Sequence, residues 1–211
     1  VELPPPSDLV VSEVLIHATT FFAGDQVTVE WTVTNRGDQI ASGVWRDALF
    51  LSRDAIWDLG DFFLGNANII RDFGRRLLPS ASYTGSLEVT LPTALPENYH
   101  VIVRTDAFDD IFEGPNNANN SRTSAGELTV DVKELVLDQA VDDSISANGE
   151  LLYFVDVPTG ETFEVQLRSP TGRNELYLRR EGLPSSFVND GRFPGLLQPN
   201  QTARIAETEA G

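Results

Sequence analysis

The sequence predicts an all-β protein, with an immunoglobulin-like β-sandwich followed by a second, incomplete β-sandwich of jelly-roll type. Three observations indicate this class. Short runs rich in Val, Ile, Thr, Tyr, Phe and Trp recur along the chain between turns rich in Gly, Pro, Asn and Asp. Apolar and polar residues alternate within several runs, as in strands with one buried face. No segment combines helix caps with the 3.6-residue apolar period of a helix.

The first domain is expected at residues 8–132, after a linker at residues 1–7. The linker contains three consecutive prolines, which hold it extended and give a sheet no N–H donors. Residues 8–17 form the first β-rich run. Residues 26–34 alternate with Val side chains and Trp31 on one face, so Trp31 is expected in the core. An Asn-Arg-Gly-Asp turn then ends this strand.

The middle of the first domain contains two further expected strands. Residues 44–52 form one of them, in which Asp47 is a structural residue bonded across the sheet. An acidic loop is expected at residues 53–65. Residues 82–91 alternate again, and Pro92 ends that strand because proline cannot donate to a sheet ladder.

A tyrosine near the start of the strand at residues 99–104 supports the immunoglobulin-like class. Tyr99 follows Leu95 by four residues, the spacing at which a tyrosine early in strand F hydrogen-bonds back to the preceding corner. Apolar residues alternate again at residues 128–132, the last expected strand. About seven short strands with an early buried tryptophan fit an immunoglobulin-like sandwich.

A second domain is expected at residues 149–211, after a linker at residues 133–148 rich in Asp, Ser, Ala and Asn. Pro-Thr-Gly turns separate its runs. Four strands are few for a closed sandwich, so this domain is expected to be C-terminally truncated and to show an open edge. The expected strands are residues 150–157, 162–169, 174–180 and 202–208.

The composition excludes several classes of partner and chemistry. The 211 residues carry 32 Asp and Glu against 15 Lys and Arg, a net charge of −17. That sign argues against nucleic acid and anionic membranes and favours cations. Cysteine is absent, so disulfides and thiolate metal sites are excluded. No apolar run is long enough to span a membrane.

The sequence also predicts that the chain is not an enzyme. It contains two histidines, too few for a zinc site without thiolates. It contains no G-x-S-x-G motif and no phosphate-binding glycine loop. No paired carboxylates can be told apart from turn aspartates.

Two acidic loops are the candidate metal-binding segments, because Ca²⁺ takes six to eight oxygen ligands of carboxylate and amide type. Two interpretations stay open. The oxygens either bind a cation, in one shared site or in two, or they cap backbone N–H groups of solvated turns. The candidate ligands are Asp54, Asp58 and Asp61 in one loop, and Asp106, Asp109, Asp110, Glu113 and Asn120 in the other.

Trp57 also has two interpretations. It lies in an acidic loop beside Ile56, Phe62 and Phe63, where exposed aromatic side chains would suit a sugar or protein contact. The same aromatic residues could instead fasten the loop over the sandwich.

Residues 8–132 resemble the CARDB family, the cell-adhesion-related domain found in bacteria. The landmarks follow in family order: DLVVSEV at residues 8–14, AGDQVTVEWTVTNRG at 23–37, W-x-D-x-x-x-L-S-x-D at 45–54, D-x-x-x-D-x-x-D-x-x-LG ending at Gly65, and LPENYHVIVRTDAFDDIFEGPNNANN at 95–120. The resemblance implies an immunoglobulin-like sandwich that is repeated in large exported proteins and assigned to adhesion.

Residues 149–211 resemble the bacterial pre-peptidase C-terminal domain, through GELLYFVDVPTGETFEVQL at residues 149–167 and NELYLRREGLPS at 174–185. That family usually has Asp before the Leu-Tyr pair, whereas this chain has Asn174-Glu175. The resemblance implies an accessory β-sandwich of secreted proteins.

Together these observations predict a non-catalytic, extracellular adhesion or spacer module of a larger secreted or surface bacterial protein, stabilised by Ca²⁺. Its partner, a protein or a glycan surface, is not identified by the sequence. The alternatives are a carbohydrate-binding module and an accessory domain of a secreted protease or other hydrolase.

Overall fold

The computed structural model describes residues 5–17, 19–69, 76–145, 147–195 and 197–208. Within them the chain is all-β, as predicted, apart from the 3-10 helix η1 (Gly114–Asn119). The chain divides into unit 1, Val1–Asp131 with Gly149–Leu151, and unit 2, Val132–Asn148 with Leu152–Gly211. Residues 1–4 of the expected linker and residues 209–211 of the expected second domain lie outside the described residues.

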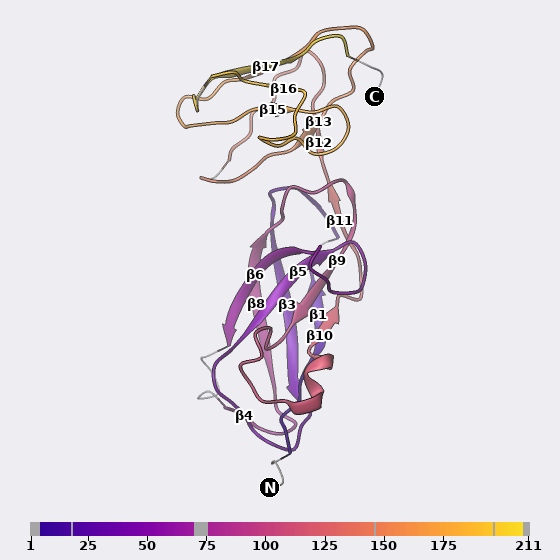
Figure 1. The fold of residues 1–211 in the computed structure, drawn as a ribbon, viewed down its shortest axis with the longest axis vertical. Helices are drawn as coiled ribbons and strands as arrows, with labels where there is room; N and C mark the ends of the chain where they lie inside the picture. The colour runs from indigo at the N-terminus through magenta and orange to yellow at the C-terminus, as the bar shows by residue number, and fades with distance from the viewer. Residues whose placement is uncertain (1–4, 18, 70–75, 146, 196, 209–211) are drawn as a thin grey trace. The chain divides into compact units, whose positions relative to one another are not determined.

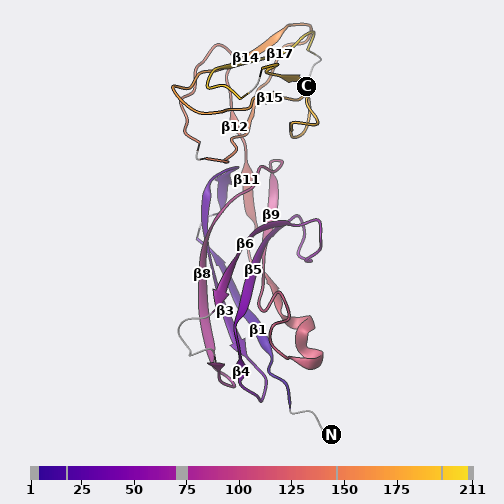
Figure 2. The same cartoon turned by 60° about the vertical axis from the view of Figure 1, so that its left-hand side comes forward.

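Unit 1 is a sandwich of two sheets (Figures 1 and 2), which confirms the predicted immunoglobulin-like class. One sheet has the strand order β1-β3-β8, and the other has the order β2-β11-β9-β5-β6, with β10 also paired to β9. A short pair, β4-β7, accompanies them. The strands are β1 (Leu9–Ile16), β2 (Thr20–Phe22), β3 (Gln26–Asn35), β4 (Ala41–Ser42), β5 (Trp45–Ser52), β6 (Phe62–Ile69), β7 (Arg76–Leu77), β8 (Ser82–Thr90), β9 (Glu97–Arg104), β10 (Ser121–Thr123) and β11 (Leu128–Asp131).

Strand β6 begins inside the segment that the sequence predicts as a loop, residues 53–65. Phe62 and Phe63 pair with β5, and the register shifts between Leu49 and Phe50, next to Gly65. A bulge of this kind lets a strand continue past an irregular residue. The loop prediction was therefore wrong for residues 62–65, because the two phenylalanines extend the sheet.

The core of unit 1 forms where the alternation predicts it. The inward side chains of β3, which include Trp31, are at most 2% exposed. Tyr99 is fully buried, and its hydroxyl donates to the carbonyl oxygen of Leu95 at 3.0 Å. The predicted tyrosine corner is therefore confirmed.

A buried polar network crosses this core. The Oδ2 atom of Asp47, on β5, accepts hydrogen bonds of 2.6 Å from Trp31 Nε1 and from the hydroxyl of Tyr83. Trp45 Nε1 donates to the same hydroxyl at 3.1 Å. Burial raises the pKa of Asp47 to about 6, although the bonds from Tyr83 and Trp31 oppose the shift. Asp47 thus bonds across the sandwich, to the facing sheet.

The strands of unit 2 form two-stranded sheets. β12 (Lys133–Glu134) pairs with β13 (Tyr153–Phe154), β14 (Phe163–Leu167) with β17 (Gln201–Ile205), and β15 (Tyr177–Leu178) with β16 (Gly191–Arg192). The four predicted runs overlap β13, β14, β15 and β17, but the observed strands are shorter than the predicted ones. β12 and β16 are two residues long, too short to show a period in the sequence.

Replacing Gly85 by Ala tests the placement of Trp31 in the core. The added Cβ would lie 2.3 Å from the indole ring, so we expect the free energy of unfolding to fall by about 1–3 kcal/mol or more. Gly126→Ala is the matched control, because its Cβ would meet nothing within 4 Å. Urea unfolding measures both variants. Equal midpoints for the two would contradict the packing of Trp31 against β8.

Candidate functional site

The structure places the two acidic loops at opposite ends of one sheet. β5 and β9 are antiparallel neighbours, with Ser52 opposite His100 and Ala48 opposite Arg104. The first loop leaves the C-terminal end of β5. The second leaves the C-terminal end of β9, where Ala107 N donates to Arg46 O at 2.9 Å. Because β5 has eight residues, about 25 Å separates the two ends. The two ligand sets do not meet in one site.

The carboxylates of the first loop accept hydrogen bonds from its own backbone. Asp54 Oδ1 accepts from Ile56 N at 2.7 Å, Asp58 Oδ1 from Gly60 N at 2.6 Å, and Asp61 Oδ2 from Asp58 N at 2.9 Å. Short side-chain acceptors of this kind cap tight turns. The arrangement matches the capping interpretation of these three residues.

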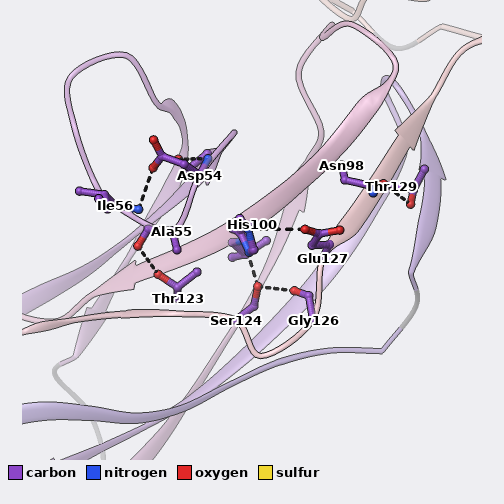
Figure 3. A network of polar contacts seen from close by, with 12 residues as sticks. Asp54, Ala55, Ile56, Asn98, His100, Thr123, Ser124, Gly126, Glu127 and Thr129 are labelled. Carbon is purple, nitrogen blue, oxygen red and sulfur yellow. Dashed lines mark hydrogen bonds and ion pairs between the residues drawn. The ribbon is translucent and has the colours of Figure 1, made fainter.

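Trp57 holds the first loop against the outer face of the sheet. Its ring is half-buried, with the Arg104 guanidinium 3.8 Å from the ring centroid and Phe50 edge-on at 5.7 Å. Figure 3 shows a second attachment, in which Thr123 Oγ1 of β10 donates to Ala55 O at 2.9 Å. The tryptophan ring therefore packs against residues of its own chain. Leu59, at the tip of the loop, is 95% exposed.

In the second loop, Asp106 organises the turn that follows β9. It is 2% exposed, and its two oxygens accept from Asp110 N and Ile111 N at 2.9 Å each. Burial raises its pKa, the two N–H donors oppose the shift, and the charges of Asp110 and Asp109 add to it. Asp109 and Asp110 themselves are exposed.

Glu113 joins the second loop to the start of β1. It is 1% exposed; Oε1 accepts from Leu9 N, and Oε2 accepts from Asn120 Nδ2. Asn119 Nδ2 donates to Asp8 Oδ1 at 2.8 Å. We call these five residues the N-terminal clamp. It ties the two ends of the domain's sequence together across 104 residues.

The environment of Glu113 is unfavourable for a charge. Burial raises its pKa to about 7, although the N–H of Leu9 and the amide of Asn120 oppose the shift. The Oδ1 atom of Asn120 is buried and has no hydrogen-bond partner among the described residues.

Asn35 supports the clamp, a role that its place at the start of the Asn-Arg-Gly-Asp turn does not predict. It is fully buried; its Oδ1 accepts from Asp8 N and Gly37 N, both at 3.1 Å, and its Nδ2 donates to Leu77 O at 3.0 Å. The sequence feature that could have indicated this role is an Asn at the end of a strand, just before a turn that contains glycine.

Within the described residues, no three or more His, Asp or Glu side chains converge as a metal-binding group. The eight candidate ligands therefore remain a prediction. The observed partners of the carboxylates are backbone N–H groups, asparagine amides and, for Asp110, the guanidinium of Arg46 at 4.0 Å.

Comparison with known proteins places the first unit in a family. The family model described as CARDB matches residues 6–124, more than half of the chain. A search of curated proteins finds no match. The family match ends at residue 124, so the pre-peptidase C-terminal resemblance of residues 149–211 stays a prediction. No helix in the described part of the chain is long and apolar enough to cross a membrane.

Solved structures with a similar arrangement include the CARDB domain of the PF1109 protein from Pyrococcus furiosus in complex with di-metal ions. That match has 16% identity and a TM-score of 0.42, and it covers 59% of this chain and 89% of that one. A solution structure of the same domain gives 18% identity, a TM-score of 0.40 and coverage of 59% and 94%. A β-glucosidase from Listeria innocua gives 16% identity, a TM-score of 0.35 and coverage of 60% and 16%, so it is matched in a small part.

Glu113→Gln tests the buried carboxyl of the clamp. Because the folded pKa of about 7 lies above the usual 4.5, the stability that Glu113 contributes is full below pH 4.5 and is lost as the pH rises through 7. Two and a half pKa units correspond to a change on the order of 3 kcal/mol. We expect the variant to lose this pH dependence, and to be more stable than the wild type at pH 8 by roughly that amount.

Urea unfolding in EDTA across this pH range measures the effect. Asp110→Asn is the control, because that carboxylate is exposed and should leave the slope unchanged. A constant difference between wild type and Glu113→Gln at every pH would show that folding does not shift the pKa of Glu113.

Proposed function

The chain belongs to the CARDB family through residues 6–124, and from this premise we propose that it is a non-catalytic spacer or adhesion module. We place it in a larger secreted or surface protein of a bacterium. The family is a non-catalytic one, and the net charge of −17 suits a solvated exterior rather than a nucleic-acid partner. The module then works through its shape and its mechanical strength.

One observation carries the spacer role: the chain enters and leaves unit 1 at opposite ends. Leu9, at the entry, pairs with Asn35 at the end of β3. Asp131, at the exit, pairs with Phe22, just before β3 begins. β3 has ten residues, so the two ends are about 30 Å apart. Figures 1 and 2 show β1 and β11 running along this axis.

This geometry makes the unit resistant to stretching. Hydrogen bonds between antiparallel strands lie perpendicular to the strands. Tension along the axis therefore loads the β1–β3 and β9–β11 ladders in shear, so that many bonds must break together. The N-terminal clamp adds bonds at the point where tension enters, through Glu113 to Leu9 and Asn119 to Asp8.

No observation favours the sugar-binding alternative at Trp57. A flat aromatic ring that stacks on a sugar needs an open face. Arg104 lies over this ring at 3.8 Å, and Phe50 contacts it from another side. The role of Trp57 is therefore to attach the loop. The accessory-domain alternative depends on a neighbouring domain, so the described residues do not test it.

We propose a Ca²⁺ site at the second acidic loop only. The buried Oδ1 of Asn120 has no partner among the described residues, and the exposed Asp109 and Asp110 lie on the same loop. Amide and carboxylate oxygens are the ligands that Ca²⁺ prefers, so the chemistry of these side chains suits the ion. Bound there, the ion would offset the repulsion among the loop carboxylates. Asp54, Asp58 and Asp61 are left as turn caps.

Forced unfolding of the chain, pulled from handles at its two ends, tests the spacer role. We expect unit 1 to unfold in one cooperative step, and at a lower force in Glu113→Ala, because the entry bonds are lost. Asp58→Ala, in the other loop, is the matched control and should unfold at the wild-type force. Gradual extension at low force, alike in all three proteins, would contradict a mechanical role.

Thermal unfolding with and without millimolar Ca²⁺ tests the cation. At a concentration 100-fold above the dissociation constant, bound Ca²⁺ should add about 2.7 kcal/mol. We expect this gain to vanish in the double variant Asp109→Asn/Asp110→Asn and to persist in Asp58→Asn. An unchanged wild-type midpoint would remove calcium from the proposal and leave the spacer role intact.

A further inference from the structure

One sheet of unit 1 ends in a long strand without charge. Its order β2-β11-β9-β5-β6 stops at β6, and no strand in the described part of the chain pairs with the outer edge of β6. β6 has the sequence FFLGNANI, which contains neither a charged residue nor a proline. Phe63 is 57% exposed, and Asn66 and Asn68 are exposed as well. An edge of this kind is a template for pairing with another strand.

The backbone groups of Asn66 and Asn68 point to this outer edge. In an antiparallel sheet, successive residues direct their N–H and C=O groups alternately to the two neighbouring strands. Arg46 O accepts a bond from the segment that follows β9, so Arg46 faces β9 and the next residue, Asp47, faces β6. Asp47 lies opposite Ala67, so Ala67 pairs with β5. The residues on either side of Ala67 therefore offer their donors and acceptors outwards.

The other edges of the sandwich are protected, whereas β6 is not. β1 and β8 flank the facing sheet, and each carries an exposed glutamate, Glu13 and Glu88. β2, at the opposite end of the same sheet as β6, has three residues. Charges and short strands are usual means of preventing edge pairing. Since the chain has a net charge of −17, two copies would meet with the least repulsion at an uncharged edge.

We infer that two copies of this chain associate through β6, edge to edge and antiparallel. Such an edge is self-complementary, because each strand offers the donors that the other accepts. A two-fold axis at Ala67 places Asn66 of each copy opposite Asn68 of the other. Their backbone groups then pair, and their exposed side-chain amides, which both donate and accept, bond to each other.

The occupant is a second copy rather than a basic strand of another protein, because β6 has no carboxylate to attract one. The association goes beyond the spacer role, which needs one chain only. It joins the β6-containing sheets of two copies into one continuous sheet.

Analytical ultracentrifugation of the full chain, from micromolar to submillimolar concentration, tests the inference. We expect a monomer–dimer equilibrium that shifts towards the dimer between about 0.05 and 0.5 M salt, because salt screens the repulsion between two acidic chains. A partner held by opposite charge would respond to salt in the opposite sense. A monomer at every concentration and at both salt levels would overturn the inference.

The double variant Asn66→Lys/Asn68→Lys tests the edge itself. We expect its dissociation constant to rise about tenfold, because like charges then lie directly opposite each other at two symmetric places. The matched control is Thr84→Lys/Ser86→Lys, which makes the same change of charge at exposed positions of the edge strand β8 and should dimerise like the wild type. Urea unfolding shows whether each variant is folded. Equal dissociation constants for the two double variants would contradict pairing through β6.

Hydrogen exchange of the wild type locates the interface. The backbone amides of Asn66 and Asn68 should exchange rapidly in dilute protein and slowly in concentrated protein, whereas the amide of Ala67 should be protected in both. Exchange at Asn66 and Asn68 that does not depend on concentration would overturn the inference even if a dimer forms. The pulling experiment uses single molecules, so the spacer proposal and this inference can fail independently.

Discussion

The carboxylate of Asp47 is a polar group that both sheets of unit 1 share, and the arrangement of the sandwich depends on it. It belongs to β5, yet its hydrogen-bond donors, Trp31 and Tyr83, lie on the facing sheet. Apolar packing alone tolerates small shifts between two sheets. Two hydrogen bonds of 2.6 Å to one oxygen do not tolerate such shifts, because a shift would leave a buried polar group without its partner. The network therefore selects one alignment of the sheets.

The same network reaches the N-terminal clamp through a few residues. The hydroxyl of Tyr83 contacts Thr105 at 3.1 Å, and the next residue, Asp106, organises the loop that carries Glu113. Most acidic side chains among the described residues are exposed, whereas Asp47, Asp106 and Glu113 are buried and have raised pKa values. Burial of these three groups is a cost of building the sandwich and of fastening its first strand.

The fold of unit 1 could be predicted because its signals are local. Alternation of period two marks β3 and the burial of Trp31, and a four-residue spacing marks the Tyr99 corner. The role of each acid could not be predicted in the same way. Glu113 and Asp110 lie three residues apart in the same acidic run, yet one is buried and the other exposed. The difference is that Glu113 accepts a hydrogen bond from Leu9 N, 104 residues away. Composition does not predict such a long-range bond.

Unit 2 shows what happens when apolar alternation is weak. Among its described residues the buried apolar side chains are Val132, Ala203 and Ile205, and two-stranded pairs are marginal by themselves. Side-chain bonds to backbone carbonyls therefore hold its loops, as where Thr208 Oγ1 donates to Pro158 O and Glu161 O. Such bonds have no period in sequence, which is why the predicted strands were longer than the observed ones. Gln201 acts in the same way, because its Nε2 donates to the carbonyl oxygens of Asn174 and Gln198.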